Sequence, residues 1–142
     1  MIQPGESDLF IRNMSSSNQI LIVDDEPLLL KMLGAYLKRL GYGVVAVSNT
    51  EKAWAAAQAG PHEFAVAVLD ATLKGIAMED LATYMLTANP KLCVIAVSGY
   101  PVDISGLQAT APGRVTFLHK PFTAEMLGTA VRRMIGTQEA DV

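Results

Sequence analysis

Short apolar runs alternate with helical patterns along the chain from residue 20 onward, and this alternation is the clearest signal in the sequence. The runs are ILIV, VVAV, AVAVL, CVIAV and VTFL, at residues 20–23, 44–47, 65–69, 93–97 and 115–118. Each run is continuously apolar, which is typical of a parallel strand covered by helices on both faces. Five such strands alternating with helices predict a doubly wound α/β fold with right-handed crossovers.

Helical periodicity fills the intervals between these runs. Apolar residues recur at helical spacing after the first strand, and Gly41 is expected to end that helix. Ser48 and Glu51 have the spacing of a capping box, so we expect Ser48 to cap the second helix. EDLATYMLTA and AEMLGTAVRRMI are also amphipathic, the second with Thr123 as its expected N-cap. Residues 99–113 are rich in glycine and proline, so any helix there is expected to be short.

The length of 142 residues suits one domain. A chain of this size can bury a core without disulfides, and its one cysteine, Cys93, is expected to be a buried thiol in the fourth strand. Residues 1–18 are polar and serine-rich. We therefore predict a flexible N-terminal extension at 1–18, the folded domain at 19–138 and a C-terminal tail at 139–142.

The charge pattern narrows the class of partner. A net charge of −3 and the lack of a basic run in the sequence argue against a nucleic-acid-binding surface. The apolar runs are too short to span a bilayer, and acids rather than basic residues precede the first of them. We therefore expect a cytoplasmic protein that binds neither nucleic acid nor membrane. Met1 and Met14 are both compatible with the start of translation.

Residues with convergent chemistry stand at the ends of the predicted strands, where doubly wound folds bind their ligands. The first strand ends in Asp24 and Asp25 and the third in Asp70, while Ser98 ends the fourth and Lys120 follows the fifth. Closely packed carboxylates repel one another unless a cation joins them, and oxygen ligands suit Mg²⁺. Mg²⁺ beside an ammonium and a hydroxyl can hold a phosphoryl group, which a carboxylate can accept as an aspartyl phosphate.

Four motifs, VDDEP, AVLDATL, AVSGY and FLHKPF, carry these residues. In order and spacing they resemble the receiver domain of two-component response regulators over nearly all of residues 19–138. The resemblance implies a flavodoxin-like receiver fold, with a five-stranded parallel sheet in the order 2-1-3-4-5. It implies that Asp70 is the phosphoacceptor and also a ligand of Mg²⁺. The acidic pair Asp24 and Asp25 and the backbone carbonyl of Thr72 would complete the metal site.

The same resemblance implies the roles of the remaining site residues. Ser98 would be the switch hydroxyl and Lys120 the cation that meets the phosphoryl oxygens. Phe117 would be the switch aromatic, although it lacks the hydroxyl of the tyrosine that is also found there. The chain departs from the family pattern after the phosphoacceptor, where Lys74 and Met78 replace a frequent proline and glycine.

The implied function is that of a single-domain response regulator. It would accept a phosphoryl group from a phosphohistidine on a sensor histidine kinase or a histidine phosphotransfer protein, and then signal to a downstream target protein. It would be no enzyme beyond self-phosphotransfer and slow autodephosphorylation. It would act as a monomer or as a phosphorylation-dependent dimer. Because few residues follow Pro121, we expect no output domain.

Two rival functions make different demands on the same residues. A phosphohydrolase with an aspartate nucleophile also places an Asp at a strand end, but it uses a second Asp two residues later, where this chain has Thr72. A pseudo-receiver, which binds partners without phosphorylation, would lack Asp70, the acidic pair or Lys120, and this chain has all of them.

Three further expectations concern single side chains. Arg132 and Arg133 are expected near the end of the last helix, where they would favour its negative dipole terminus. Trp54 is expected to pack from a helix face. On charge repulsion alone, Asp25→Ala or Asp70→Asn should stabilise the metal-free protein.

Overall fold

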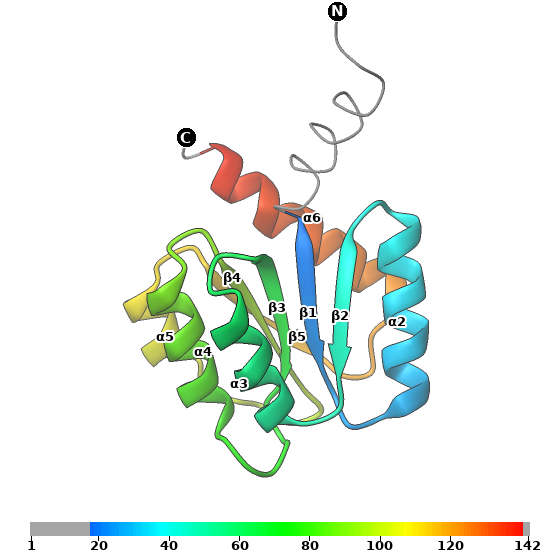
Figure 1. The fold of residues 1–142 in the computed structure, drawn as a ribbon, viewed down its shortest axis with the longest axis horizontal. Coiled ribbons are helices and arrows are strands. Elements are labelled where there is room, and N and C mark those ends of the chain that lie inside the picture. Colours follow the sequence, from blue (N-terminus) through cyan, green and yellow to red (C-terminus); the bar gives the residue numbers. More distant parts are fainter. Residues whose placement is uncertain (1–17, 141–142) are drawn as a thin grey trace, which may run out of the picture.

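Five parallel strands form one sheet in the order β2-β1-β3-β4-β5 (Figure 1). The structure is a computed structural model that describes residues 18–140. The strands are β1 (Gln19–Val23), β2 (Gly43–Val47), β3 (Phe64–Asp70), β4 (Cys93–Ser98) and β5 (Val115–His119). The predicted strand order is confirmed, and each predicted strand boundary lies within about one residue of the observed one. The extension predicted at 1–18 lies outside the described residues except for its last residue.

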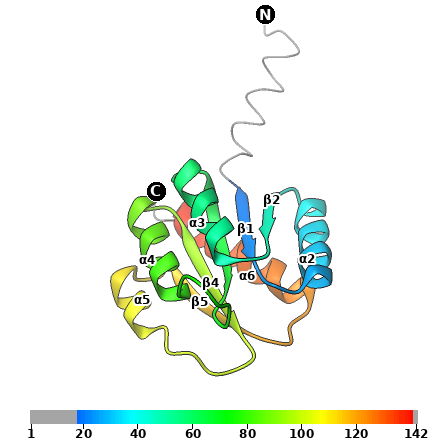
Figure 2. The ribbon, with the colours of Figure 1, turned by 60° about the horizontal axis from the view of Figure 1, so that its bottom comes forward.

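Helices cover both faces of the sheet (Figures 1 and 2). One face packs against α2 (Pro27–Arg39) and α6 (Ala124–Ala140), and the other against α3 (Thr50–Ala59), α4 (Met78–Ala88) and α5 (Ser105–Thr110). The helix predicted to be short, α5, is short, and α6 runs into the segment predicted as a tail. Within the described range, no helix has the length and apolarity needed to cross a membrane.

The apolar side chains of the strands form two separate core layers, one on each face of the sheet. Along β1, Ile20 and Ile22 pack with the α2 and α6 layer, whereas Leu21 and Val23 pack with the α3, α4 and α5 layer. This follows from the two-residue period of a strand, since neighbouring side chains leave opposite faces of the sheet. Cys93 is fully buried, as predicted, and burial raises the pKa of its thiol to about 11. The thiol therefore stays protonated, and it donates a weak hydrogen bond to the carbonyl of Met134 at 3.7 Å.

The two predicted helix caps have different outcomes. The hydroxyl of Thr123 accepts the backbone N–H of Met126 at 3.1 Å, as a cap does. The prediction for α3 is wrong, because Asn49 rather than Ser48 is its N-cap, and the Asn49 side chain accepts the N–H of Lys52 at 2.8 Å. The helix begins at Thr50, so Asn49 stands at the N-cap position. From there its short polar side chain can accept a free backbone N–H of the first turn.

The predictions for Trp54 and for the two arginines of the last helix have different outcomes. Trp54 packs from α3 onto Tyr84 of α4, with ring centroids 4.5 Å apart, as its predicted place on a helix face requires. Arg132 and Arg133 lie in the middle of α6, because the helix continues to Ala140, so their predicted place near the helix end is wrong.

The strands place all of their carboxyl ends at one edge of the sheet, the lower edge in Figure 1. Residue pairs across the sheet set which ends are neighbours. Val23 pairs with Leu69 and Asp70 pairs with Val97, while Ser98 pairs with His119. The residues that follow β1, β3, β4 and β5 therefore meet along this edge, seen from below in Figure 2.

Candidate functional site

Three aspartates from β1 and β3 form an acidic cluster at the carboxyl edge of the sheet. Asp24, Asp25 and Asp70 each offer a carboxylate oxygen, and these oxygens all lie within 4.8 Å of one another. Asp24 and Asp70 are each only 4% exposed, whereas Asp25 is open to solvent. The predicted convergence of these three residues is confirmed by their geometry.

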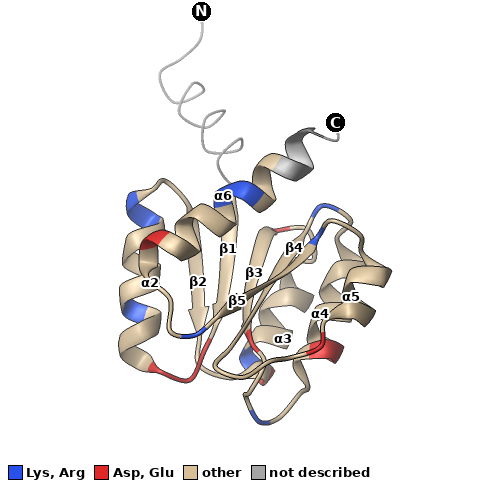
Figure 3. Ribbon diagram, turned by 180° about the vertical axis from the view of Figure 1, so that it is seen from behind, with Lys and Arg blue, Asp and Glu red and all other residues tan. Residues whose placement is uncertain are grey.

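The ammonium of Lys120 lies inside this acidic cluster. Its Nζ is 2.8 Å from Oδ2 of Asp24 and 3.1 Å from Oδ2 of Asp70. Glu26 adds a third carboxylate, 3.4 Å from the same nitrogen. The backbone N–H of Lys120 donates to the carbonyl of Ser98 at 2.9 Å, which extends the β4–β5 ladder past the end of β5. In the view from behind, acidic (red) and basic (blue) ribbon come close together where the turn into α2 meets the loop into α6 (Figure 3).

The charge of Lys120 is held firmly in this setting. Burial by itself would lower the pKa of the ammonium, but hydrogen bonds and ion pairs with Asp24 and Asp70 outweigh burial and raise the pKa. Lys120 is therefore protonated throughout the physiological range. A fixed positive charge among closely spaced carboxylates offsets their mutual repulsion.

The pKa values of the two buried carboxyls of the cluster are shifted in opposite directions. Burial is the largest influence on both and raises the pKa of each. Oδ1 of Asp70 accepts the backbone N–H and the hydroxyl of Thr72, at 2.9 and 2.7 Å, and with Lys120 these donors bring the pKa of Asp70 below its usual value. Asp24 has fewer donors, Lys120 and the N–H of Glu26, so its pKa stays raised. The pKa of Asp70 is thus the one held below its usual value.

These contacts bear on the expectation that Asp70→Asn stabilises the metal-free protein. Stabilisation by Asp70→Asn would follow if the carboxylates repelled one another without compensation. Instead, Thr72 donates to one oxygen of Asp70 and Lys120 to the other. Neutralising Asp70 would remove charged hydrogen bonds, so the substitution is now expected to destabilise the metal-free protein.

Thr50 is a residue beside the site that sequence reasoning did not single out. Its hydroxyl is buried at the start of α3, accepts the N–H of Ile76 at 2.9 Å and lies 3.2 Å from the carbonyl of Lys74, to which it donates. It therefore ties α3 to the loop that follows Asp70. No local pattern could have revealed this, because its partners are 24 and 26 residues away.

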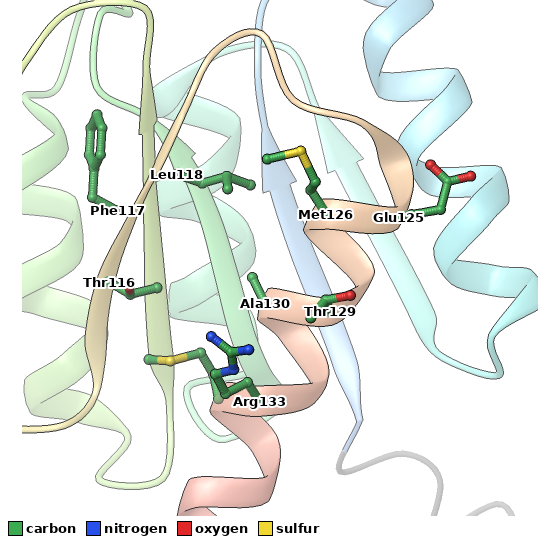
Figure 4. Close-up of a pocket in the computed structure, with 9 residues that line it drawn as sticks. Thr116, Phe117, Leu118, Glu125, Met126, Thr129, Ala130 and Arg133 are labelled. Atoms are coloured by element: carbon green, nitrogen blue, oxygen red, sulfur yellow. The ribbon is translucent and has the colours of Figure 1, made fainter.

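Ser98 and Phe117 lie on the strands next to the cluster. Ser98 ends β4, is fully buried, and its hydroxyl oxygen accepts the N–H of Tyr100 at 3.0 Å. Phe117 is half-buried on β5, with its ring edge-on to His119 at a centroid distance of 6.3 Å. Figure 4 shows Phe117 and Leu118 leaving β5 in opposite directions. Ser98 therefore borders the site directly, whereas Phe117 sits further along the sheet edge.

Two open surfaces flank the cluster. On α2, Leu28 is 83% exposed and Met32 is 48% exposed, just beyond the acidic turn. On the other side, a shallow groove of about 400 Å³ runs between β5 and α6, and Met126 and Ala130 line it (Figure 4). Exposed apolar side chains of this kind are suited to contact with another protein.

The donor set of the acidic cluster fits a hard divalent cation. All three candidate ligands offer carboxylate oxygens, which suit Mg²⁺, and within residues 18–136 no other group of three or more acidic, histidine or cysteine ligands meets this spacing. The ammonium of Lys120 already pairs with two of these aspartates, Asp24 and Asp70. Asp24, Asp25 and Asp70 are therefore the residues that would hold the metal.

Comparisons with known proteins agree with this geometry. The family model of the response regulator receiver domain matches residues 20–132. A cyclic di-GMP phosphodiesterase of Thermotoga maritima is 28% identical over 108 residues, which cover 76% of this chain and 28% of that protein. The chain likewise spans only 24% and 26% of two transcriptional regulators from Rhizobium meliloti.

Solved structures show the same fold. A CheY-like receiver domain protein from Methanospirillum hungatei superposes with a TM-score of 0.75 at 23% identity, covering 88% of this chain and 98% of that chain. A response regulator from Burkholderia pseudomallei, solved with a phosphorylated aspartic acid and a calcium ion, has a TM-score of 0.67 at 23% identity. That match covers 87% of this chain and 72% of that chain.

Proposed function

The chain belongs to the response regulator receiver domain family, and from this premise we propose that it accepts a phosphoryl group on Asp70 from a phosphohistidine donor, in a reaction that depends on Mg²⁺. The observation that carries the proposal is the state of Asp70. It is a buried carboxylate, kept ionised by Thr72 and Lys120, within an acidic cluster suited to a divalent cation. An ionised carboxylate is the form that can act as a nucleophile.

The residues of the cluster divide the work of phosphoryl transfer. An oxygen of Asp70 attacks phosphorus, the phosphorus–nitrogen bond of the donor breaks, and the histidine nitrogen leaves with the electron pair. Lys120, already 3.1 Å from Asp70, then meets the phosphoryl oxygens with a charge-assisted hydrogen bond. Mg²⁺ held by Asp24, Asp25 and Asp70 would supply positive charge against the phosphoryl oxygens. The backbone carbonyl of Thr72 stays a predicted fourth ligand.

The phosphorylated aspartic acid and calcium ion of the Burkholderia pseudomallei regulator support this assignment. They show that this fold can carry both a phosphoryl group and a divalent cation. In the present chain, only Asp70 among the clustered acids receives three hydrogen-bond donors. It is therefore the residue proposed to be modified.

The proposed phosphodonor is a sensor histidine kinase or a histidine phosphotransfer protein. It must bring a histidine to Asp70, so it must cover the surface around the acidic turn. The exposed side chains of Leu28 and Met32 on α2 offer an apolar contact at that place. Burying such side chains favours association, at roughly 25 cal/mol for each Å² of apolar surface removed from water.

The proposed signal is a change at Ser98 and in the segment that follows it. Once Asp70 carries a phosphoryl group, the hydroxyl of Ser98 would turn to donate to it and release the N–H of Tyr100. The loop over residues 99–104 would then move, and Phe117 could occupy the space that it leaves. A downstream target protein would read this face, including the groove between β5 and α6.

Mass spectrometry tests the phosphoacceptor. With acetyl phosphate and Mg²⁺, the protein should gain one phosphoryl group, and EDTA or Asp70→Asn should abolish the gain. Asp80→Asn, which removes an exposed carboxylate from α4, should leave it intact. Labelling that persists in Asp70→Asn would refute the assignment, and multiple turnovers on phosphomonoesters would favour the phosphohydrolase instead.

Hydrogen exchange tests the switch. With beryllofluoride and Mg²⁺, changes in amide protection should concentrate at residues 98–120. If the changes fall mainly on α2 and α3, or if none occur, the proposed signalling face is wrong. The measurement is independent of any partner, so it separates the switch from the identity of the kinase.

A further inference from the structure

We propose that Thr50 is a positioning residue for the phosphoacceptor site. Its buried hydroxyl would hold the β3–α4 loop, residues 71–77, in the place from which Thr72 bonds Asp70 and can offer its carbonyl to Mg²⁺. This inference rests on the proposed function, because it concerns the same site. Thr50 touches none of the reacting atoms and acts only through the loop.

The hydroxyl of Thr50 bridges two backbone groups of that loop. It accepts the N–H of Ile76 at 2.9 Å and donates toward the carbonyl of Lys74 at 3.2 Å. Thr50 is only 2% exposed, so water cannot readily take over these bonds. The hydroxyl of threonine can accept one hydrogen bond and donate another at the same time. Valine, the closest steric analogue of threonine, has no polar group in its side chain. The side chain thus fixes the loop at two points that bracket one residue.

The bracketed residue, Gly75, shows how closely the loop is seated on α3. Its φ angle of +96° lies in the left-handed region that side chains rarely adopt. A Cβ added to Gly75 would overlap the carboxylate of Glu51 and the hydroxyl of Thr50. The loop therefore approaches the start of α3 at backbone distance, and this approach depends on both the glycine and the threonine.

The loop is short enough to carry this constraint to Asp70. Only Leu73 separates Thr72 from Lys74, whose carbonyl Thr50 holds. Thr72 in turn donates its N–H and its hydroxyl to Oδ1 of Asp70. A loop released from α3 would let Thr72 move away, which would remove two of the three hydrogen-bond donors to Asp70.

The helix that carries Thr50 is itself well anchored. Asn49 caps its first turn, and Trp54 stacks on Tyr84 of α4. Thr50 is therefore a fixed reference point against which the loop is held. The role of Thr50 is separable from helix stability, because the Asn49 cap stabilises the same helix end without touching the loop.

Three variants test the proposal. Thr50→Val keeps the branched shape and removes the hydroxyl, Thr50→Ser keeps the hydroxyl, and Asn49→Ala weakens α3 without touching the loop contacts. The first measurement is the hydrogen-exchange rate of the Thr72 amide, monitored by NMR in metal-free protein. The second is the Mg²⁺ dissociation constant, measured by calorimetry with Mg²⁺ alone, at a temperature where every variant is folded.

Thr50→Val should speed the exchange of the Thr72 amide by about tenfold, the effect of losing one ordinary hydrogen bond. It should also raise the Mg²⁺ dissociation constant by about tenfold, the size of effect known for partners that orient metal ligands. Thr50→Ser should stay within about twofold of wild type in both readouts, and so should Asn49→Ala.

Two results would overturn the inference. One is faster exchange at Ile76 with no change at Thr72 and none in Mg²⁺ affinity, which would make Thr50 purely structural. The other is an equal effect of Asn49→Ala, which would indicate general loosening of α3. Failure of the wild-type protein to bind Mg²⁺ would instead count against the proposed function, and Thr72 exchange in metal-free protein would still decide whether Thr50 positions the loop.

Discussion

Replacing Asp70 by Asn should lower the stability of the metal-free protein at pH 7, even though it removes a negative charge from an acidic cluster. The carboxylate accepts two donors from Thr72 and one from Lys120. The Asn carbonyl can still accept from Thr72, but its NH₂ group would face the ammonium of Lys120 as donor against donor. The substitution therefore removes the hydrogen bond between Lys120 and Asp70, in which both groups are charged.

The expected loss combines two opposing effects. A hydrogen bond to a charged group contributes about 1.5–3 kcal/mol. Removing Asp70 also relieves repulsion on Asp24, whose pKa it helps to raise, and at this separation relief of about 1 kcal/mol is reasonable. Lys120 keeps Asp24 and Glu26 as partners, so no buried charge is left alone. The net loss should be about 0.5–2 kcal/mol.

The loss should disappear in acid. The pKa of Asp70 is lower in the folded protein than its ordinary value of 3.8, so the carboxylate contributes stability above that value and loses it as pH falls through the folded pKa. The gap between wild type and Asp70→Asn should be full at pH 7 and shrink below about pH 4. Asp24 has a raised pKa and contributes the opposite trend, which is weaker in Asp70→Asn because the repulsion from Asp70 is gone.

Urea unfolding in EDTA measures this difference, with the fluorescence of Trp54, the only tryptophan of the chain, as the probe. The midpoint should fall by about 0.25–1 M, given a typical urea dependence of about 2 kcal/mol per M. Asp103→Asn is the control, since Asp103 is an exposed carboxylate that also accepts a backbone N–H. Should Asp70→Asn equal or exceed wild type at pH 7, repulsion would dominate and the compensation argument would be wrong.

Three further measurements address the core, the metal and the partner surface. Arg114→Met should destabilise the protein by about 2–3 kcal/mol in thermal unfolding, because the guanidinium donates to three carbonyls at the end of α4 and beyond it. Mg²⁺ at a hundred times its dissociation constant should stabilise wild type by about 2.7 kcal/mol, and Asp25→Ala should show a clearly smaller gain. Leu28→Glu should slow transfer from a phosphohistidine protein by about tenfold or more yet leave labelling by acetyl phosphate unchanged, and equal slowing with both donors would refute a docking role.

The edge of the sheet that holds the site followed from the local pattern of the sequence, whereas the strand order was implied only by the resemblance to receiver domains. A continuous apolar run signals a strand that is buried on both faces, and parallel strands all end at one edge. Residues that directly follow such runs must meet there, as Asp24, Asp70 and Lys120 do. The position of the chemistry was thus set by the ends of the apolar runs.

Only the tertiary structure determined which carboxylates pair with the ammonium of Lys120. Whether a carboxyl is raised or lowered in pKa depends on how many donors reach it, and the donors to Asp70 come from Thr72 and from Lys120, 50 residues away. The bridge from Thr50 to the β3–α4 loop likewise joins residues that no local period relates. Apolar burial is proportional to area and leaves a period in the sequence, whereas a hydrogen bond depends on the separation of two particular atoms, which only the folded chain defines.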